Sequence, residues 1–205
     1  MIKERHEDDF NNLSTEQIIR IPVDRVGALV GKEGAIREEI ERRCGVTLTI
    51  DGKTGEVRIS FKPEALVESN PFKAADIVSA VARGFSPQRA FTLLEEEKTL
   101  SVVDLREFTG KSENALTRIK SRLIGTDGKA RRLIEQLTGS EISIYGHTVA
   151  IIGEPDESRI AKEAVEKLAR GGTHKSTYEM LQKYRTKQKL DRLQLWETQK
   201  PIGET

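Results

Sequence analysis

The sequence predicts an α+β protein built from two similar domains, and three observations lead to this prediction. A stretch with two glycines, an apolar stripe of helical spacing and a third glycine occurs twice, at 31–50 and 125–144. In each copy, alternating apolar and polar residues follow the stripe, which indicates a helix that leads into a strand. The chain has 205 residues, which is enough for two small domains. A repeat of this length predicts related domains rather than a solenoid of short units.

The first copy predicts the order strand, helix, glycine loop, helix, strand, strand and helix. The expected ranges are, in that order, 18–23, 24–30, 31–34, 36–44, 46–50, 57–61 and 63–83. Pro22 favours an edge position or the end of the first strand, and Asp24 is expected to cap the short helix. Gly45 stands where a C-terminal helix glycine belongs. The two strands around the turn at 51–55 predict a hairpin.

The second copy predicts the same order, with a longer helix before its glycine loop. The expected ranges are 100–105, 116–124, 125–128, 130–137, 142–144, 149–151 and 161–168. A short helix over 87–97 is expected to precede this copy, and a net basic helix over 175–198 to follow it. The basic helix has three open roles, which are packing on the second domain, binding RNA and binding a protein.

These patterns predict five segments along the chain. They are a flexible N-terminal arm (1–17), a first domain (18–83), a linker with a short helix (84–99), a second domain (100–172) and a basic C-terminal helix and tail (173–205). Each domain is expected to place a three-stranded sheet against three helices, because a sheet buries its apolar face against another layer.

Composition restricts the classes of function that the chain can have. The 34 Lys and Arg residues nearly cancel the 33 Asp and Glu residues, so a site for a polyanion has to be a local patch. The three His residues and the single Cys show no metal-ligand spacing, and Cys44 is expected in the core. No leader and no membrane-spanning apolar run is recognised. We therefore expect a cytoplasmic protein with no membrane contact, no metal and no cofactor.

Each glycine loop has features that suit a nucleic-acid backbone. A two-residue step between helices needs a sharp turn, which glycine supplies while letting a sugar-phosphate chain come close. The helix after the loop directs free N–H groups and its positive dipole end toward that chain. The following strand offers an edge on which unpaired bases can lie. The groove is too narrow for a duplex, so the expected ligand is single-stranded RNA.

At this point the residues resemble the KH family. Residues 26–34, Ile36, Ile40 and the stretch 45–50 match its signature, and the predicted element order is that of the eukaryotic, type I arrangement, β-α-α-β-β-α. The resemblance implies two type I KH domains plus a C-terminal helix. It also implies a groove in each domain that clamps about four nucleotides of single-stranded nucleic acid.

Three further stretches resemble a narrower group within that family. Residues 83–87, 103–110 and 172–178 are similar to archaeal relatives of the Krr and partner-of-Nob proteins of small-subunit ribosome assembly. The resemblance covers the chain from about Ile18 to Arg185. It implies binding near the 3′ end of small-subunit ribosomal RNA during rRNA processing. It further implies contact with a maturation endonuclease or an initiation factor subunit.

The expected RNA interface combines the two loops with the residues that flank them. Its glycines admit the backbone, its basic residues neutralise phosphates, and Val30 and Ile124 border the groove for the bases. The full set is Gly27, Val30, Gly31, Lys32, Glu33, Gly34, Arg37, Arg122, Ile124, Gly125, Thr126, Asp127, Gly128, Lys129, Arg131 and Arg132.

The two loops differ in charge. The first contains Lys32 beside Glu33, whereas the second contains Thr126 and Asp127 and no basic residue. A carboxylate repels the phosphate that the loop should hold. On the loop residues alone, we therefore expect the first loop to be the better clamp. Basic residues that flank the second loop can offset Asp127.

Other functions receive less support from the sequence. The stretch 27–32 resembles a phosphate-binding P-loop, but it is one residue short and follows a helix instead of a strand. No nucleophile and base pair is recognisable, so we expect no catalytic residue and no enzymatic activity. Two alternatives to ribosome biogenesis stay open. They are a protein-interaction adaptor and an RNA-binding regulator of transcription or RNA decay.

Overall fold

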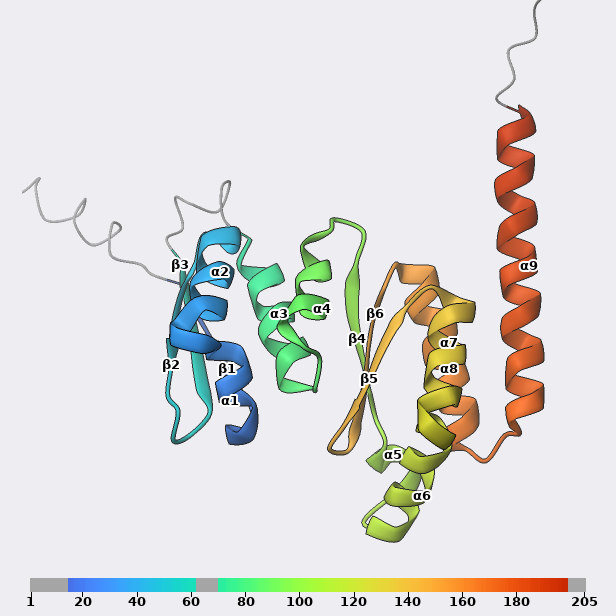
Figure 1. Ribbon diagram of the computed structural model, residues 1–205, viewed down its shortest axis with the longest axis horizontal. Coiled ribbons are helices and arrows are strands. Elements are labelled where there is room, and N and C mark those ends of the chain that lie inside the picture. The colour runs from blue at the N-terminus through green and yellow to red at the C-terminus, as the bar shows by residue number, and fades with distance from the viewer. Residues whose placement is uncertain (1–14, 62–69, 199–205) are drawn as a thin grey trace, which may run out of the picture. The chain divides into compact units, whose positions relative to one another are not determined.

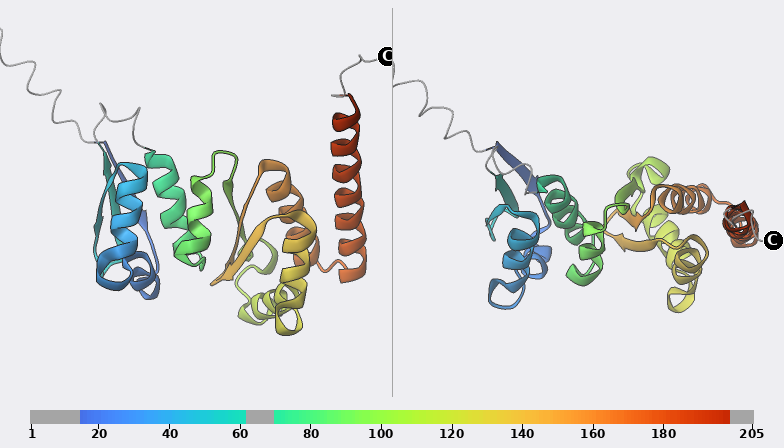
Figure 2. Two further views of the ribbon diagram at one scale, coloured as in Figure 1. Left: turned by 45° about the horizontal axis from the view of Figure 1, so that its top comes forward. Right: turned by 90° about the horizontal axis from the view of Figure 1, so that it is seen from above.

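A computed structural model describes residues 15–61 and 70–198 of the chain. The chain divides into two compact units, Met1–Leu100 and Ser101–Thr205. In each unit, helices cover one face of a three-stranded sheet, as Figures 1 and 2 show. The structure thereby confirms the predicted α+β class with two domains of the same architecture.

The first unit follows the predicted element order. Its elements are β1 (Thr15–Arg20), α1 (Val23–Val30), α2 (Ala35–Cys44), β2 (Thr47–Ile50), β3 (Glu56–Phe61), α3 (Pro71–Ala82) and α4 (Pro87–Ala90). The sheet has the order β1-β3-β2, and both neighbouring pairs are antiparallel. The strand β2, which follows the glycine-loop helix, is therefore an edge strand. The core between sheet and helices includes Leu29, Ile40, Ile59 and Ile77, which are fully buried.

The boundaries of the first unit differ from the prediction around β1 and α1, and the strand predicted to end at Val23 ends at Arg20. The strand β1 begins at Thr15 and so includes the last residues of the predicted arm, because backbone pairing with β3 does not require apolar side chains. Asp24 does not cap α1: the helix begins at Val23 after Pro22, and no side chain caps it. Residues 1–14 of the predicted arm, and 63–69 of the predicted long helix, lie outside the described residues.

The segment 84–99, predicted as a linker, contributes to the core of the first unit. The helix α4 and the 3₁₀ turn Phe91–Leu94 follow α3 and pack on it, and Phe85 and Leu93 are buried. Arg25 of α1 fixes this segment, because its guanidinium donates hydrogen bonds to the carbonyls of Val81 and Phe85. Apolar side chains in this stretch therefore bind it to the unit.

The second unit repeats the order with one additional helix near its start. Its elements are β4 (Thr99–Asp104), α5 (Arg106–Thr109), α6 (Glu113–Ile124), α7 (Lys129–Thr138), β5 (Glu141–Tyr145), β6 (Thr148–Gly153), α8 (Pro155–Ala169) and α9 (His174–Thr198). The sheet order is β4-β6-β5, so β5 is an edge strand like β2. The division between the units falls inside β4.

The long C-terminal helix α9 packs through its first half. Leu181 is fully buried, and Tyr178, Met180 and Tyr184 pack against the core cluster of the second unit. Farther along the helix, Leu190 and Leu193 are each 53% exposed. Of the roles left open for this helix, packing on the second unit is thus confirmed for its first half.

Two results concern functions that the composition argued against. Within the described part of the chain, no helix is both long and apolar enough to cross a bilayer. In the same residues, no three His, Cys, Asp or Glu side chains are grouped so as to hold a metal ion. Cys44 is buried as expected, and its burial raises the pKa of the thiol to about 11.

Replacing Leu181 by Ala tests how strongly α9 is anchored. Because the side chain is fully buried, we expect Leu181→Ala to lower the free energy of unfolding by about 2–5 kcal/mol. The exposed Leu190 on the same helix is the matched control, and Leu190→Ala is expected to change it by less than about 0.5 kcal/mol. Urea denaturation measures both. Equal effects of the two substitutions would contradict the packing described for α9.

Candidate nucleic-acid interface

The two glycine loops have nearly the same backbone conformation. Gly31 has φ 74° and ψ −178°, and Gly125 has φ 71° and ψ 176°. Two residues later, Glu33 and Asp127 take the left-handed conformation, with φ of 55° and 51°. They are the only non-glycine residues with positive φ in the described parts of the chain. The two loops therefore share one backbone conformation despite their different side chains.

The first glycine of each loop is required by a steric contact. A Cβ atom on Gly31 would lie 2.4 Å from Cγ1 of Ile36, and one on Gly125 would lie 2.8 Å from the backbone nitrogen of Ala130. Real Cβ atoms do not approach other atoms so closely. The start of the next helix therefore packs directly on this glycine, which sets the sharp angle between the two helices.

The second glycine of each loop has room for a Cβ atom, which would meet only side chains at ordinary contact distance. A Cβ atom on Gly34 or Gly128 would meet nothing closer than 3.7 Å or 3.5 Å, respectively. These glycines are the N-cap residues of α2 and α7, and no side chain caps either helix. The first N–H groups of both helices thus lack a capping side chain, at the end where the helix dipole is positive. This arrangement suits an anion such as a phosphate group.

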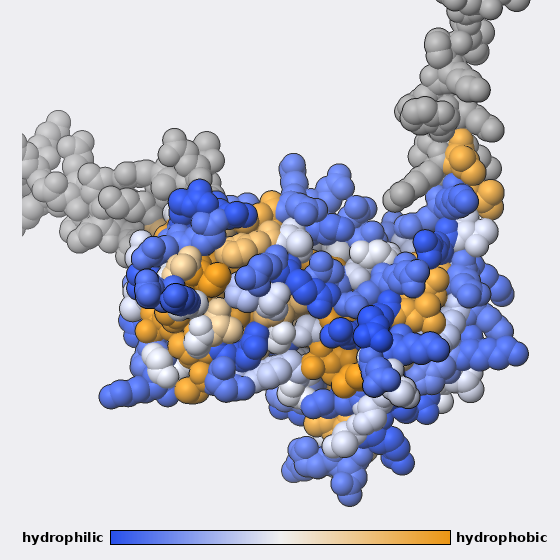
Figure 3. Space-filling model, in the orientation of Figure 1, coloured by the Kyte–Doolittle hydropathy of each residue, from blue (hydrophilic) through white to orange (hydrophobic). Residues whose placement is uncertain are grey.

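The side chains in both loops are open to solvent. Lys32, Glu33, Thr126 and Asp127 are all exposed. On the face drawn in Figure 3, hydrophilic residues cover most of the surface, with apolar residues in smaller patches among them. Both loops are therefore accessible to a ligand from solvent.

An apolar residue directly before each loop lies beside it. Ile124 is 37% exposed and Val30 is half-buried. The edge strands β2 and β5 follow the helices α2 and α7 that start at the loops. The predicted groove between loop and edge strand thus has the elements that it needs in both units.

In the first unit, a glutamate connects the loop helix to the edge strand. Oε1 of Glu41 accepts a hydrogen bond from the backbone N–H of Leu48 in β2, at 2.7 Å. Its Oε2 lies 3.7 Å from Nε of Arg37, which is buried without a hydrogen-bond partner among the described residues. Arg37 and Glu41 therefore form a pair that holds α2 against β2.

The second unit contains the same arrangement. Oε1 of Glu135 accepts a hydrogen bond from the N–H of Ile142 in β5, at 2.8 Å, and Oε2 lies 3.8 Å from the buried Nε of Arg131. Sequence reasoning expected Arg37 to contact a phosphate and Arg131 to offset the charge of Asp127 beside the second loop, and it gave the two glutamates no role. The signal was present, because Arg and Glu recur at the same register of the repeat.

The remaining predicted interface residues occupy different environments. Gly27 lies on the exposed side of α1 with open space around it, and Lys129 is exposed in the first turn of α7. Arg122 donates a hydrogen bond from Nη2 to the carbonyl of Gly172, so it connects α6 to the segment before α9. Its guanidinium is thus bound within the protein, in contrast to the exposed Lys129.

A charge difference appears at the second glycine of each loop. The atom nearest to a Cβ on Gly34 is Oε1 of Glu38, whereas the atom nearest to a Cβ on Gly128 is Nη1 of Arg132. At the first loop, Nη2 of Arg37 lies almost as near, at 3.9 Å, so this side borders a carboxylate and a guanidinium together, whereas the second loop borders a guanidinium. The residues between the two glycines predicted that the first loop binds phosphate better, and this contrast favours the second loop instead.

Substituting the two glycines of the second loop separates their roles. We expect Gly128→Ala to lower the free energy of unfolding by about 1–2 kcal/mol, the cost of a left-handed alanine. Gly125→Ala adds the collision with Ala130, so we expect a loss of roughly 2–5 kcal/mol. Chemical denaturation of both variants measures the difference. Equal losses would show that the helix start does not pack on Gly125 as described.

The hydrogen bond from the N–H of Leu48 to Glu41, here called the glutamate tie, is tested by removing the carboxylate and measuring the stability of the protein. We expect Glu41→Ala to lower the free energy of unfolding by roughly 1–3 kcal/mol, because the N–H of Leu48 loses a charged acceptor. Glu41→Gln keeps an acceptor oxygen and is expected to lose less. Glu39 on the same helix, paired only with the exposed Arg42 and Arg43, provides the control Glu39→Ala. Hydrogen exchange at the Leu48 amide reports the tie directly, and unchanged protection in Glu41→Ala would refute it.

Comparison with protein-family models matches both units to one family. Residues 15–68 match the KH domain model, and residues 99–186 match a model described as a eukaryotic type KH-domain (KH-domain type I). The second match ends within α9, close to where the packed half of that helix ends. These matches confirm the family to which the residues of the loops pointed.

Several relatives align over most of the chain. A KH domain-containing protein of Methanocaldococcus jannaschii is 43% identical over 95% of this chain and 86% of its own length. The pre-rRNA-processing protein PNO1 of Saccharomyces cerevisiae is 26% identical over 78% of this chain and 59% of its own. The crystal structure of Dim2p from Pyrococcus horikoshii has a TM-score of 0.76 at 44% identity, covering 82% of this chain and 99% of that one.

A further solved structure carries RNA. A chain in the crystal structure of the a/eIF2alpha–aDim2p–rRNA complex from Pyrococcus horikoshii matches with a TM-score of 0.80 at 41% identity. The match covers 88% of this chain and 99% of that one. The chain belongs to the tandem KH-domain family that includes archaeal Dim2p and the PNO1 pre-rRNA-processing proteins.

Proposed function

We propose that this protein binds single-stranded RNA in ribosome biogenesis, at the 3′ region of small-subunit ribosomal RNA, as a non-catalytic assembly factor. One observation carries the proposal. Two exposed loops with the same strained backbone each open a helix N-terminus that no side chain caps, and an edge strand follows each. Such a site suits the phosphates and unpaired bases of a single strand.

The relatives support the ribosomal context. PNO1 proteins are described as pre-rRNA-processing proteins, and aDim2p is described in a complex with rRNA and a/eIF2alpha. By this likeness we extend the proposal to an initiation factor subunit as a partner on the RNA, and from the family resemblance of the sequence we propose a maturation endonuclease as the alternative partner. The proposed site of action is the cytoplasm, where archaeal ribosomes assemble.

The local charge favours the second loop as the stronger clamp. Apart from Arg37, which pairs with Glu41, the stretch 31–38 contains one cation, Lys32, and two carboxylates, Glu33 and Glu38. Apart from Arg131, which pairs with Glu135, the stretch 125–132 contains two cations, Lys129 and Arg132, and one carboxylate, Asp127. Since phosphate contacts supply most of the nonspecific affinity for RNA, we propose that the second unit contributes more to binding.

Additional negative charge in each loop tests the proposed function. The variants are Lys32→Asp with Glu33→Asp in the first loop and Thr126→Asp in the second, all at exposed positions. Each is expected to weaken binding of a single-stranded RNA roughly tenfold or more and to flatten the salt dependence of the affinity. We expect the larger loss from the second loop.

Filter binding across a salt series, with duplex RNA of the same sequence as a control, measures these effects. Unchanged affinity in both variants would overturn RNA binding at the loops and favour the protein-interaction adaptor. Sequencing of RNA crosslinked to the protein in cells separates ribosome biogenesis from regulation of transcription or decay. Recovery of messenger RNA without small-subunit rRNA would contradict the ribosomal assignment.

A further inference from the structure

A polar pocket of about 610 Å³ lies in the second unit, apart from the loop itself. Its walls are α5, the first turns of α6 and the turn between β5 and β6. Four basic side chains line it, which are Arg106, Lys111, Lys120 and His147, whereas Glu113 is the only carboxylate in the lining. A pocket with this lining favours an anion over an apolar ligand.

The pocket exists because the second unit has extra chain where the first has none. In the first unit, α1 begins at Val23, almost directly after β1, and has 8 residues. In the second unit, α5 and a connecting segment are added after β4, and α6 has 12 residues. Most of the pocket lining comes from this addition and from the longer α6.

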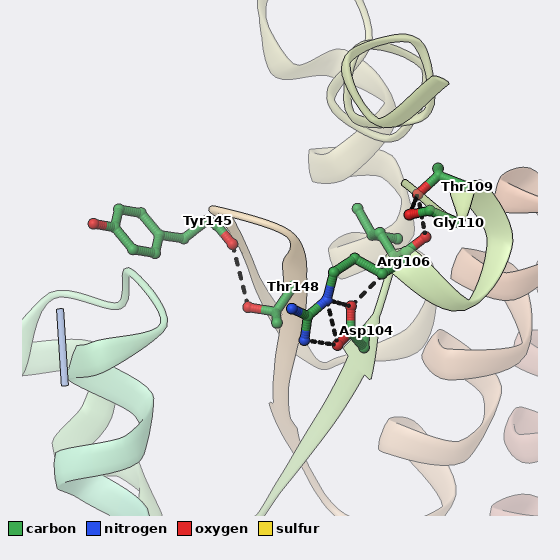
Figure 4. A network of polar contacts seen from close by, with 7 residues as sticks. Asp104, Arg106, Thr109, Gly110, Tyr145 and Thr148 are labelled. Carbon is green, nitrogen blue, oxygen red and sulfur yellow. Dashed lines mark hydrogen bonds and ion pairs between the residues drawn. The ribbon is translucent and has the colours of Figure 1, made fainter. Parts of the chain in front are cut away.

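One of the four basic groups is already paired. The carboxylate of Asp104 at the end of β4 accepts hydrogen bonds from Nε and Nη2 of Arg106, as Figure 4 shows. The pair lowers the pKa of Asp104 to about 2, and the charge of His147 contributes to that decrease. The pairing holds Arg106 in place at the pocket and offsets its charge.

The two lysines supply the charge that remains. Neither Lys111 nor Lys120 forms an ion pair within the described residues. Lys111 precedes α6 and is exposed, and Lys120 lies two turns into α6 and is half-buried. Together they outweigh Glu113, so the pocket is net positive even with neutral His147.

The position of the pocket connects it to the proposed RNA groove. The helix α6 lines the pocket with its first turns and leads into the loop at Gly125 with its last residue. A helix of this length spans about 18 Å. On the other side, His147 lies with Gly146 in the short turn that joins β5, the edge strand of the same unit, to β6. An RNA strand that extends from the loop along α6 therefore passes the pocket.

We propose that this pocket binds phosphate groups of an RNA strand beyond the nucleotides held at the loop 125–128. The inference rests on the proposed function, because it extends the groove of the second unit. About four nucleotides occupy a KH groove, and the pocket takes the backbone of the nucleotides next to them. Lys111 and Lys120 are the residues that neutralise these phosphates.

The experiment compares two RNAs with the full-length protein. One is a tetranucleotide that fills only the groove, and the other is about three times as long. Both are titrated into a background with Lys32→Asp and Glu33→Asp, in which the first loop does not compete. The test variant carries Lys111→Ala and Lys120→Ala. The variant with Arg at both positions keeps the charge, and Lys162→Ala with Lys175→Ala is a control at exposed lysines on α8 and α9.

We expect the alanine variant to bind the longer RNA roughly three- to tenfold more weakly and the tetranucleotide as before. The salt slope for the longer RNA is expected to decrease by about 1.4, for two lost contacts to a single strand. The arginine variant and the α8 and α9 control are expected to keep the affinity.

Two results would overturn the inference while leaving the proposed function intact. They are an unchanged affinity of the alanine variant for the longer RNA, and an equal loss for both RNAs. If the background protein binds neither RNA and the unaltered protein also binds neither, the proposed function itself fails. Thermal unfolding of each variant, recorded alongside, shows that the comparison is made between folded proteins.

Discussion

In each unit, the first glycine of the loop contacts the start of the next helix, and the geometry of both loops depends on this contact. Atoms of Ile36 and Ala130 occupy the space that a Cβ on Gly31 or Gly125 would need. Because the helix start lies so close, the chain turns sharply within the loop and begins a helix that no side chain caps. The two loops keep this geometry with Lys-Glu in one and Thr-Asp in the other. The backbone, and not the loop side chains, therefore defines the site.

The hydrogen bonds from the edge strands to Glu41 and Glu135 connect each loop helix to the edge strand of its sheet. Glu41 and Glu135 each hold the N–H of an edge strand while an arginine lies against their second oxygen. In an antiparallel ladder, the N–H and C=O of one residue point to the same side. With the N–H of Leu48 already bonded, its carbonyl and the backbone of Ile50 remain on that side of the strand. The tie thus also decides which backbone groups are left for a base.

The two units share a fold and differ in what surrounds it. The second unit has α5, a longer α6, the polar pocket and the packed half of α9, and its loop is flanked by more cations. In the first unit, the chain after α3 is used to complete the core, with Phe85 and Leu93 buried. The two units therefore share the geometry of the loop and differ in the elements around it.

The sequence by itself determined the α+β class, the duplication, the order of the elements and the two loops. Each of these depends on local patterns, such as the apolar spacing of helices and strands and the glycines that turns require. It also carried the recurring Arg and Glu, but their role could not be read from it, because the hydrogen bond to the edge strand joins residues of two elements. The prediction that Asp24 caps α1 was wrong for a similar reason: the start of α1 depends on Pro22 and on where β1 ends, not on Asp24 alone. Only the tertiary structure decided which cations are paired, which lie at the loops, and that Arg106, Lys111, Lys120 and His147 meet in one pocket. These charges come from separate segments, and only folding brings them within reach of one another.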